Sequence, residues 1–464
     1  GSTTGTITDM DGNFTLEVPD QATLLVSYIG YTPKEVAVKN QNNLSIMMIE
    51  DSKTIDEVVV IGYGSVKKSN LTGAVSSVKT TEIQQTPMTS IDQGLVGRAS
   101  GVQVTQTSGM PGAVASIRVR GSSSLQGGNE PLYVIDGFPV YSGTGFGSTG
   151  GNTQISGLST VNPSDIESIE ILKDASATAI YGARAANGVV LITTKSGKKG
   201  RDIITFESSF GVQNVAKTID VMNAQEYAAL VNEAYTNDGL DAPYNTTQLG
   251  EIAKLGNGTN WQDEILKTGI DQNYNFSYAG GTDKIKFYGA LGYQKVDGII
   301  KPSKYNRFSG KININANLYS WLKTDVSMNI IQSDGSFISD NNSVGQGGAI
   351  MSALVTPSFL PIWGSQLNVR DTNPDGTYMD GYKDGQYAEN PYQSGWENPV
   401  SLLSRQNKTA VNRYLSSISF DVNIMNNLIW KPMVSFDLTR SDNVQFVDPY
   451  SNVWGRNGND NPSS

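Results

Sequence analysis

The chain has 464 residues, enough for two or more domains, and its 34 basic and 44 acidic residues give a formal net charge of −10. This balance, without a clustered basic face, argues against a nucleic-acid partner. The absence of cysteine and histidine excludes disulfides, histidine-dependent nucleophilic catalysis and zinc sites built on these ligands. No paired-carboxylate or lysine motif singles out other chemistry, so we predict no catalytic residue, no metal and no cofactor.

Residues 1–50 are predicted to form a small β domain. Its expected strands are Gly5–Thr8, Asn13–Val18, Thr23–Tyr28, Lys34–Val38 and Asn43–Ile49. An Asp-Gly pair, Asp11 and Gly12, predicts a tight turn between the first two strands. The same run loosely matches the start of a calcium-binding loop, but it lacks the glutamate at the twelfth position, so we interpret it as a turn.

Residues 51–70 are a predicted linker with a short apolar strand in it. Glu57, Val58, Val59, Val60 and Ile61 place four β-branched side chains between charged residues and glycines. Buried in a sheet, this segment is an ordinary strand. On a flexible linker, it is an exposed edge that can pair with a strand of a partner protein.

Residues 71–200 are predicted to form an α/β domain. A helix is expected over Ser90–Ser100, with Ile91, Leu95 and Val96 on its buried face. The expected strands are Val102–Gln106, Ser116–Arg120, Leu132–Ile135, Ser168–Leu172 and Gly188–Thr194. Between the last two strands, Asp174 is expected to cap an alanine-rich helix and Gly182 to end it in a left-handed conformation.

From residue 202 onward, apolar and polar residues alternate repeatedly, which predicts β-strands with one apolar face. The seven expected strands are Asp202–Gln213, Gln272–Gly281, Lys284–Val296, Arg307–Leu318, Leu322–Ile331, Val411–Ile424 and Leu428–Arg440. Each is about long enough to cross a bilayer with tilt. Short and long connections alternate between them, as in membrane β-barrels, where short turns lie on the periplasmic side and long loops outside.

Several phrases of the sequence resemble one family. They are EVVVIGYG from Glu57, GVQVTQTSGMPGAVASIRVRG from Gly101, PLYVIDGFPV from Pro131 and DIESIEILKDASATAIYGARAANGVVLITTK from Asp165. Together they resemble the SusC-like (SusC/RagA-type) TonB-dependent outer-membrane transporters of Bacteroidetes. The implied fold is mainly β, with a truncated N-terminal β-sandwich, an α/β plug domain and the first strands of an antiparallel transmembrane β-barrel.

The resemblance assigns the four regions in order. Residues 1–50 are part of a carboxypeptidase-regulatory-like β-sandwich, residues 51–70 a linker with a TonB box, residues 71–200 the plug, and residues 201–464 the start of the barrel with long extracellular loops. Plugged transporters have about 22 barrel strands, so seven strands imply that the chain is the first part of a longer polypeptide.

The resemblance also implies a function and a location. In this family an oligosaccharide or a peptide is imported across the bacterial outer membrane together with a SusD-like surface lipoprotein. TonB, with its inner-membrane energising complex, pulls on the periplasmic N-terminal region. Outer-membrane lipid surrounds the barrel. The residues expected to contact TonB are Glu57, Val58, Val59, Val60 and Ile61.

Substrate contacts are expected in two loops. The loop after Val140 contributes Tyr141 and Phe146, and the long loop Ser333–Thr409 contributes Trp363, Tyr382 and Trp396, whose rings suit stacking on sugars or peptides. The same rings also suit packing within the loop or contact with a partner. An amphipathic helix at Asn223–Tyr235 is expected to order another outer loop.

Two motifs in these loops have less specific interpretations. Gly145–Gly150 fits the G-x-G-x-x-G spacing, but no apolar helix follows, so we interpret it as a flexible loop. Asp371–Gly376 resembles the start of a calcium loop whose twelfth residue is Tyr382 and not glutamate. Two other functions stay open at this point: a soluble or surface-exposed β-sandwich adhesin, and a signalling TonB-dependent receptor.

Overall fold

The computed structural model divides the chain into two compact units, residues 1–59 with 65–72, and residues 60–64 with 73–464. It describes residues 5–9, 12–19, 21–28, 31, 34–39, 41, 43–48, 58–61, 64–67, 75–79, 91–106, 109–113, 115–121, 129–140, 158, 161–174, 178–200, 202–338, 341–342, 346–363, 387–388 and 397–446. Within these ranges, no helix has both the length and the apolar character needed to cross a membrane.

The first unit contains one antiparallel strand pair among its residues before the linker. β1 (Thr23–Val26) pairs with β2 (Lys34–Ala37). Asp11 of the predicted turn lies outside the described residues. Beside it, the Asp9 carboxylate accepts the backbone N–H of Asn13 at 2.7 Å, and the Gly12 N–H donates to the Asp9 carbonyl at 3.1 Å. The strands predicted on both sides of this turn and at Asn43–Ile49 are wrong, because residues 5–9, 13–19 and 43–48 form no ladder. Only Val38 is a buried hydrophobic residue in the described part of this region, so little apolar contact supports further pairing.

The linker region forms a β-hairpin. β3 (Val58–Ile61) and β4 (Gly64–Lys67) make a two-stranded sheet in which each strand has one neighbour. The strand predicted at this place is therefore present, and one of its edges is occupied by β4.

A five-stranded mixed sheet, here called the small sheet, forms the centre of the second unit's first half. Its order is β5 (Val75–Lys79), β10 (Ile166–Leu172), β11 (Val189–Thr194), β8 (Leu132–Ile135) and β9 (Phe138–Val140). β10 and β11 are antiparallel, whereas β11 and β8 are parallel. Because both faces are covered, the strands are continuous apolar runs such as Val189–Ile192, which is buried throughout.

One face of the small sheet is covered by a short helix and a second strand pair. α2 (Ile91–Gly94), β6 (Val102–Gln106) and β7 (Ala115–Val119) place Ile91, Leu95 and Ile117 in the main apolar core. The helix predicted over Ser90–Ser100 is therefore wrong in length. The α-helix ends at Gly94, and Gly97 has a positive φ of 71°, which an α-helix does not accommodate. Val96 is 52% exposed instead of buried.

The alanine-rich segment between β10 and β11 differs from the predicted capped α-helix. It forms a 3₁₀ stretch, η4 (Ala179–Ala185), whose N-cap is Thr178. Gly182 has the expected positive φ, 65°, but it lies inside the stretch and divides it. Asp174 forms an ion pair with Arg120 at 2.5 Å, and its backbone carbonyl accepts the N–H of Thr178.

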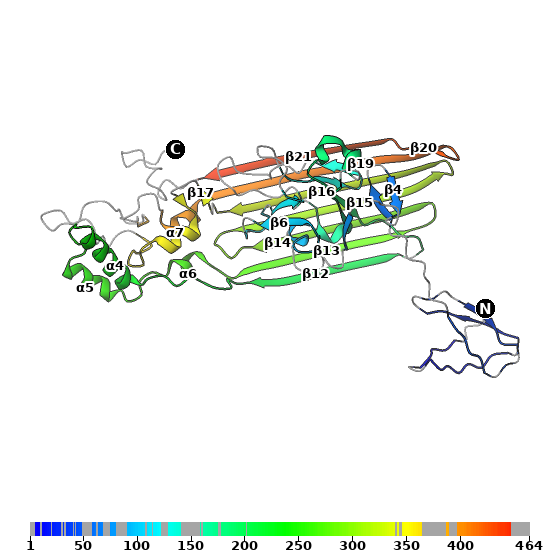
Figure 1. The fold of residues 1–464 in the computed structure, drawn as a ribbon, viewed down its shortest axis with the longest axis horizontal. Helices are drawn as coiled ribbons and strands as arrows, with labels where there is room; N and C mark the ends of the chain where they lie inside the picture. Colours follow the sequence, from blue (N-terminus) through cyan, green and yellow to red (C-terminus); the bar gives the residue numbers. More distant parts are fainter. Residues whose placement is uncertain are drawn as a thin grey trace. The chain divides into compact units, whose positions relative to one another are not determined.

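An eight-stranded antiparallel sheet, here called the long sheet, forms the second half (Figure 1). Its strands are β12 (Ile203–Gln213), β13 (Gly269–Gly281), β14 (Ile285–Asp297), β15 (Lys304–Tyr319), β16 (Leu322–Phe337), β19 (Gln406–Met425), β20 (Leu428–Trp430) and β21 (Met433–Phe446). All seven predicted strands are confirmed. The last is divided into β20 and β21 at Pro432, which has no N–H to donate to the ladder. The sheet is open, because β12 pairs with β13 alone and β21 with β19 alone.

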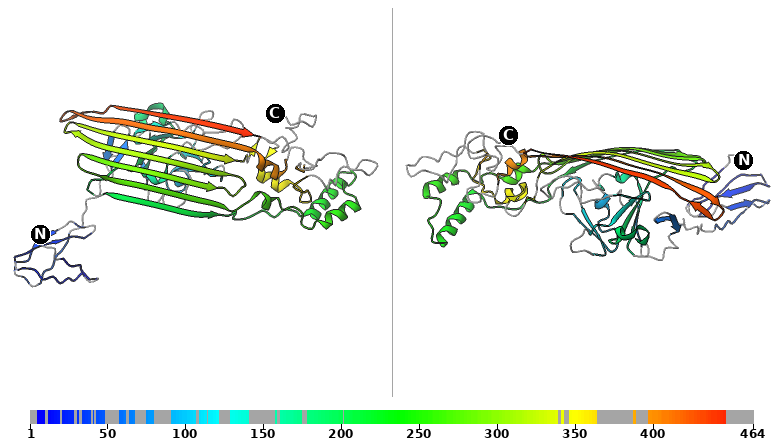
Figure 2. Two further views of the ribbon diagram at one scale, coloured as in Figure 1. Left: turned by 180° about the vertical axis from the view of Figure 1, so that it is seen from behind. Right: turned by 90° about the horizontal axis from the view of Figure 1, so that it is seen from above.

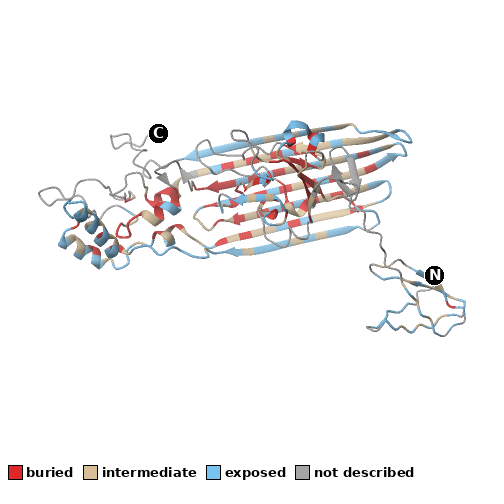
Figure 3. Cartoon of the chain, in the orientation of Figure 1, coloured by how far each residue is buried: buried red, intermediate tan, exposed pale blue. Residues whose placement is uncertain are grey.

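The two faces of the long sheet differ in polarity, as the alternation predicts. One face exposes large apolar side chains, and burial alternates along the strands (Figure 3). Phe206 is 67% exposed and Leu438 is 60% exposed. The opposite face carries Arg307, Lys311 and Asn313, all of which are buried. We call these the outer and inner faces.

The connections lie at opposite ends of the long sheet (Figure 1). Residues 282–284, 320–321 and 426–427 are short turns at one end. At the other end, two long connections carry the helices α4 (Ala224–Asn237), α5 (Thr246–Lys254), α6 (Trp261–Ile265), α7 (Ala349–Val355) and α8 (Pro399–Ser404), with the two-residue strands β17 (Asn341–Asn342) and β18 (Gln346–Gly347). Both long connections contribute to one apolar cluster around Trp261 and Phe359.

The helix predicted at Asn223–Tyr235 is confirmed as α4. Asn223 is its N-cap and forms a reciprocal capping box with Glu226. Ala224 and Ala228 are buried, and Tyr227 and Val231 pack against the same apolar cluster, whereas Leu230 is 47% exposed.

Candidate functional site: the interface between the small and long sheets

The small sheet packs against the inner face of the long sheet (Figure 2). The contact between them consists mainly of polar side chains with hydrogen-bond partners on both sides. Two clusters carry most of these bonds, one around Asp136 and one around Asn162.

Asp136 lies in the tight turn between β8 and β9 and has a positive φ of 48°. An Asp-Gly pair tolerates this conformation at low cost, which explains the turn at this point of the chain. Its carboxylate accepts the backbone N–H of Thr194 at 2.9 Å and the hydroxyl of Thr194 at 2.7 Å. The turn is therefore fixed to the end of β11 within the small sheet.

The same carboxylate also binds the long sheet. Lys311 on β15 lies 3.4 Å from Asp136 Oδ2, and Ser327 on β16 donates to this atom at 3.2 Å. The Lys311 side chain is only 1% exposed and also donates to Asn329 at 3.0 Å. A buried ammonium group is unfavourable without such partners, so Lys311 depends on Asp136 and Asn329.

Asn313 extends this cluster toward the end of β11. Its amide nitrogen donates to the Thr194 hydroxyl at 3.1 Å and to the backbone carbonyl of Lys195 at 2.8 Å. The chain after β11 then passes very close to the long sheet. A Cβ atom at Gly197 would lie 2.4 Å from the backbone nitrogen of Phe287, so only glycine fits there.

Asn162 forms the second cluster, at the start of the 3₁₀ turn η3 (Pro163–Asp165), which it caps. Its amide nitrogen donates to Asn275 Oδ1 at 2.7 Å and lies 3.2 Å from the Ser309 hydroxyl. The Asn275 amide donates to Ser164 at 2.9 Å. Gly292 makes this approach possible, because a Cβ atom there would lie 2.4 Å from the Asn162 nitrogen.

Asp165 connects the same turn to β14. The Tyr288 hydroxyl donates to its carboxylate at 2.9 Å. Burial raises the pKa of Asp165, and the Tyr288 hydrogen bond and the nearby Lys311 act in the opposite direction. Desolvation therefore favours the protonated form of Asp165, whereas the Tyr288 hydrogen bond and the positive charge of Lys311 favour its carboxylate form.

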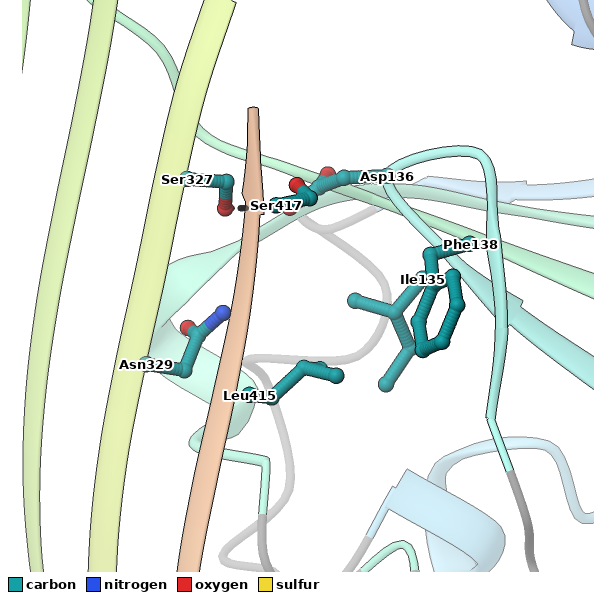
Figure 4. A pocket seen from close by; sticks show the side chains of 7 residues that line it. All are labelled: Ile135, Asp136, Phe138, Ser327, Asn329, Leu415 and Ser417. Carbon is teal, nitrogen blue, oxygen red and sulfur yellow. Dashed lines mark hydrogen bonds between the residues drawn. The ribbon is translucent and has the colours of Figure 1, made fainter. Parts of the chain in front are cut away.

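A small pocket lies between the two sheets beside Asp136 (Figure 4). Its lining residues are Ile135, Asp136 and Phe138 from the small sheet, and Ser327, Asn329, Leu415 and Ser417 from the long sheet. Leu415 also belongs to the apolar core of the small sheet, so this core ends directly against the long sheet.

The described side chains of this interface are joined mainly by hydrogen bonds, which suit reversible contact. A hydrogen bond to a neighbouring side chain contributes only about 1 kcal/mol net, because water can replace the partner. Within the described residues, no group of three or more acidic side chains is arranged to hold a metal ion. The interface therefore holds the small sheet through bonds that are individually weak.

The structure describes only part of the predicted contact residues. Val58, Val59, Val60 and Ile61 form β3, whereas Glu57 lies outside the described residues. Tyr141, Phe146, Tyr382 and Trp396 also lie outside them, as do the motifs at residues 145–150 and 371–376. These assignments remain predictions.

Trp363 is the one predicted substrate contact that is described. Its ring is stacked on that of Tyr387, with centroids 4.5 Å apart and an interplanar angle of 24°, and the residue is 51% exposed. Part of the ring therefore packs within the long connection between β16 and β19, which agrees with the packing interpretation. The remaining half is accessible.

The sequence analysis did not identify the residues of the interface. Two weak signals were present in the sequence. Asp136 and Gly137 form an Asp-Gly pair directly after an apolar strand, and Lys311 lies in a polar row rich in asparagine. Both patterns are common in ordinary turns and solvated strands. Their pairing depends on a contact between residues 175 positions apart.

Comparison with known proteins gives the same architecture. Residues 1–60 match the CarboxypepD_reg-like domain, and residues 67–189 match the TonB-dependent Receptor Plug Domain. Over 99% of its length, the chain is 35% identical to the TonB-dependent receptor SusC of Bacteroides thetaiotaomicron, of which it covers 44%. It is 36% identical to TonB-dependent receptor P26 of Formosa agariphila, with 97% of this chain and 42% of that protein covered.

The chain belongs to the SusC-like family of TonB-dependent receptors. Its fold agrees with the structure of the RagAB peptide importer in the open-open state, with a TM-score of 0.66 at 25% identity over 84% of this chain and 43% of that one. It spans less than half the length of these relatives.

The family assignment identifies the domain to which each of the two sheets belongs. In this SusC-like receptor, the small sheet with its flanking elements is the core of the plug domain, and the long sheet is an open part of the barrel wall. TonB-dependent receptors are outer-membrane β-barrel proteins and not enzymes. This agrees with the sequence-based prediction of no catalytic residue.

Proposed function

We propose that this chain carries out TonB-dependent import of an oligosaccharide or a peptide across the bacterial outer membrane, together with a SusD-like surface lipoprotein. The observation that carries this proposal is the wall with two unlike faces. Its outer face exposes apolar side chains that suit lipid, and its inner face is hydrogen-bonded to a plug. A soluble binding module has no use for such an exposed apolar face.

In the proposed orientation, the short turns face the periplasm and the helix-bearing connections face outward. The plug precedes β12 in the chain, so the linker with β3 lies on the periplasmic side. TonB adds a strand to β3 and transmits force drawn from the inner-membrane proton gradient.

The polar interface explains how a pull on the linker can move the plug. The hydrogen bonds of Asp136, Asn162 and Asn313 to their partners can be exchanged for bonds to water one at a time. The apolar core of the plug stays intact during such a movement, because it lies mostly within the plug itself. The lumen then opens along the polar inner face without exposing a large apolar surface.

The helix-bearing connections suit contact with substrate and with the lipoprotein. They form a separate apolar cluster and leave Trp363 partly accessible. RagAB is described as a peptide importer, which supports the choice of a peptide, whereas the similarity to SusC leaves an oligosaccharide equally supported. We therefore propose both substrate classes for testing.

The test compares cells with and without the gene for this protein. A fluorescently labelled oligosaccharide mixture and a fluorescently labelled tryptic peptide mixture are offered separately, and accumulation inside the cells is measured. We expect the deletion to lower accumulation of one mixture at least tenfold, and complementation to restore it. Unchanged accumulation of both mixtures in the deletion strain would contradict the proposal.

A second measurement tests the partner. Mild detergent extraction of native outer membranes, followed by affinity purification of this protein, is expected to yield a lipoprotein in similar molar amount. If the protein is repeatedly isolated alone, the paired-importer part of the proposal is wrong, although a TonB-driven transporter remains possible.

A further inference from the structure

The inner face of the wall carries many polar side chains, but one end of it is apolar. At the end with the long connections, four inward side chains are apolar and almost completely buried: Val296 of β14, Tyr305 of β15, Phe337 of β16 and Val411 of β19. We call them the rim cluster. Elsewhere, the same inward row carries residues such as Arg307, Lys311 and Asn313. At the rim cluster, the inward positions therefore depart from the alternation of polar and apolar side chains along these strands.

The rim cluster is a defined site in the wall. Val296 lies directly opposite Tyr305 in the β14–β15 ladder, and Gly335 lies opposite Tyr305 in the next ladder. Gly335 provides the room that Phe337 occupies, because a Cβ atom there would lie 2.1 Å from Cζ of the Phe337 ring. The missing side chain at Gly335 thus lets two aromatic rings share the rim.

The plug occupies this site with one segment, Gly109–Ala113, which we call the tip segment. Met110 packs against the rim cluster, and Pro111 and Gly112 are buried. Gly112 has a φ of 75°, and a Cβ atom on it would lie 3.0 Å from Cδ2 and Cε2 of Tyr305. A glycine is therefore required twice here, by the backbone conformation and by the approach of the ring.

The contact differs physically from the rest of the plug–wall interface. The hydrogen bonds of Asp136 and Asn162 have water as a ready substitute, whereas the rim cluster and Met110 lose apolar contact that water does not replace. The contact also lies at the long-connection end of the strands. A pull that loosens the polar clusters does not by itself release it.

We propose that the tip segment and the rim cluster form an outer latch, which keeps the plug closed against the wall and must be released as a separate step of each transport cycle. This proposal rests on the proposed transport function for the role of the latch. The latch itself is a property of this chain and is testable without a transport substrate.

These 464 residues contain no cysteine, so a cysteine introduced among them is the only thiol in this part of the protein. Any cysteine elsewhere in the full-length protein is first replaced by serine. In the full-length protein in native outer membranes, Val411→Cys places a thiol under the tip segment, and a bulky, membrane-impermeant maleimide reports its accessibility. Leu415→Cys is the matched control: it lies on the same strand and the same face, four residues farther from the rim, under the plug core. We expect slow labelling at both positions.

Replacing Met110 with serine is expected to raise the labelling rate of Val411→Cys at least fivefold and to leave that of Leu415→Cys unchanged. An unchanged rate at position 411 would overturn the latch. A similar rise at both positions would also overturn it, because the whole plug would then have been displaced.

The role in transport is tested in energised cells. This experiment uses Val411→Cys with the native Met110. If the latch opens in each cycle, an uncoupler that collapses the proton gradient lowers the labelling rate of Val411→Cys. Equal rates with and without the uncoupler would overturn the cycle step. Cross-linking of β3 to TonB is measured in the same cells: if it fails as well, the proposed function is wrong, and if it succeeds, only the latch step is wrong.

Discussion

At the scale of single residues, the interface depends on a buried charge held by few partners. Lys311 has almost no access to water, and its ammonium group contacts the Asp136 carboxylate and the Asn329 amide oxygen. Asp136 has additional donors from Thr194 and Ser327. The two partners are thus unequal: the carboxylate keeps hydrogen bonds when the lysine is lost, whereas the ammonium group depends on the carboxylate for its counter-charge.

Lys311→Met is therefore expected to weaken the attachment of the plug without unfolding it. We expect the free energy of local opening of β11 to fall by about 1–3 kcal/mol, since Asp136 retains three donors. Hydrogen–deuterium exchange of the β11 amides in detergent solution measures this change as roughly 5- to 150-fold faster exchange, since about 1.4 kcal/mol corresponds to a factor of ten. Lys323→Met, at an exposed lysine on β16, is the control. Equal exchange in the two variants would show that the ion pair does not hold the plug.

At the scale of elements, the strands predicted from residue 71 onward followed their sequence patterns, whereas the two helical segments predicted in residues 71–200 did not follow their local signals. The capping box of α4 was sufficient to begin that helix at Ala224. By contrast, the helix at Ile91 is only one turn long, and the alanine-rich segment forms 3₁₀ turns divided at Gly182. A single turn forms few internal hydrogen bonds, so its length is set by the core against which Ile91 and Leu95 pack.

The β3–β4 hairpin gives a prediction at this scale. Val59→Pro removes one backbone N–H and the edge geometry that an added strand needs. We expect the cross-linking yield between this protein and TonB in energised cells to fall at least tenfold, with normal amounts of protein in the outer membrane. Val66→Pro in β4 is the matched control, since it disturbs the hairpin while leaving the backbone groups of β3 intact. A normal yield with Val59→Pro would remove the TonB-binding assignment from β3.

At the scale of the whole molecule, the wall is an open sheet with an apolar outer face. Phe206 and Leu438, on its first and last long strands, are both mostly exposed. In water, such a face costs free energy in proportion to its area, whereas in a bilayer it replaces contacts between lipid tails. The polar inner face needs the plug or water for its hydrogen bonds, so the two faces require different surroundings.

We expect the protein to stay in the membrane pellet after high-salt and alkaline washes and to be released only by detergent. Leu438→Lys on the outer face is expected to lower the amount of inserted protein, since a lysine facing lipid costs about 2–4 kcal/mol near the bilayer centre. Ser435→Lys on the inner face of the same strand is the control. Release by the washes, or equal insertion of both variants, would favour a surface adhesin over a membrane wall.

The sequence by itself determined the strands of the wall, because alternation with a period of two is a local property that each strand carries independently. It also determined α4 through Asn223 and Glu226, and the family through four separate phrases. The tertiary structure alone decided the site. Asp136 meets Lys311, Asn162 meets Asn275 and Met110 meets the rim cluster only after segments far apart in the chain pack together. Such contacts depend on register and on glycines that leave space, such as Gly292 and Gly335, and neither leaves a periodic trace in the sequence.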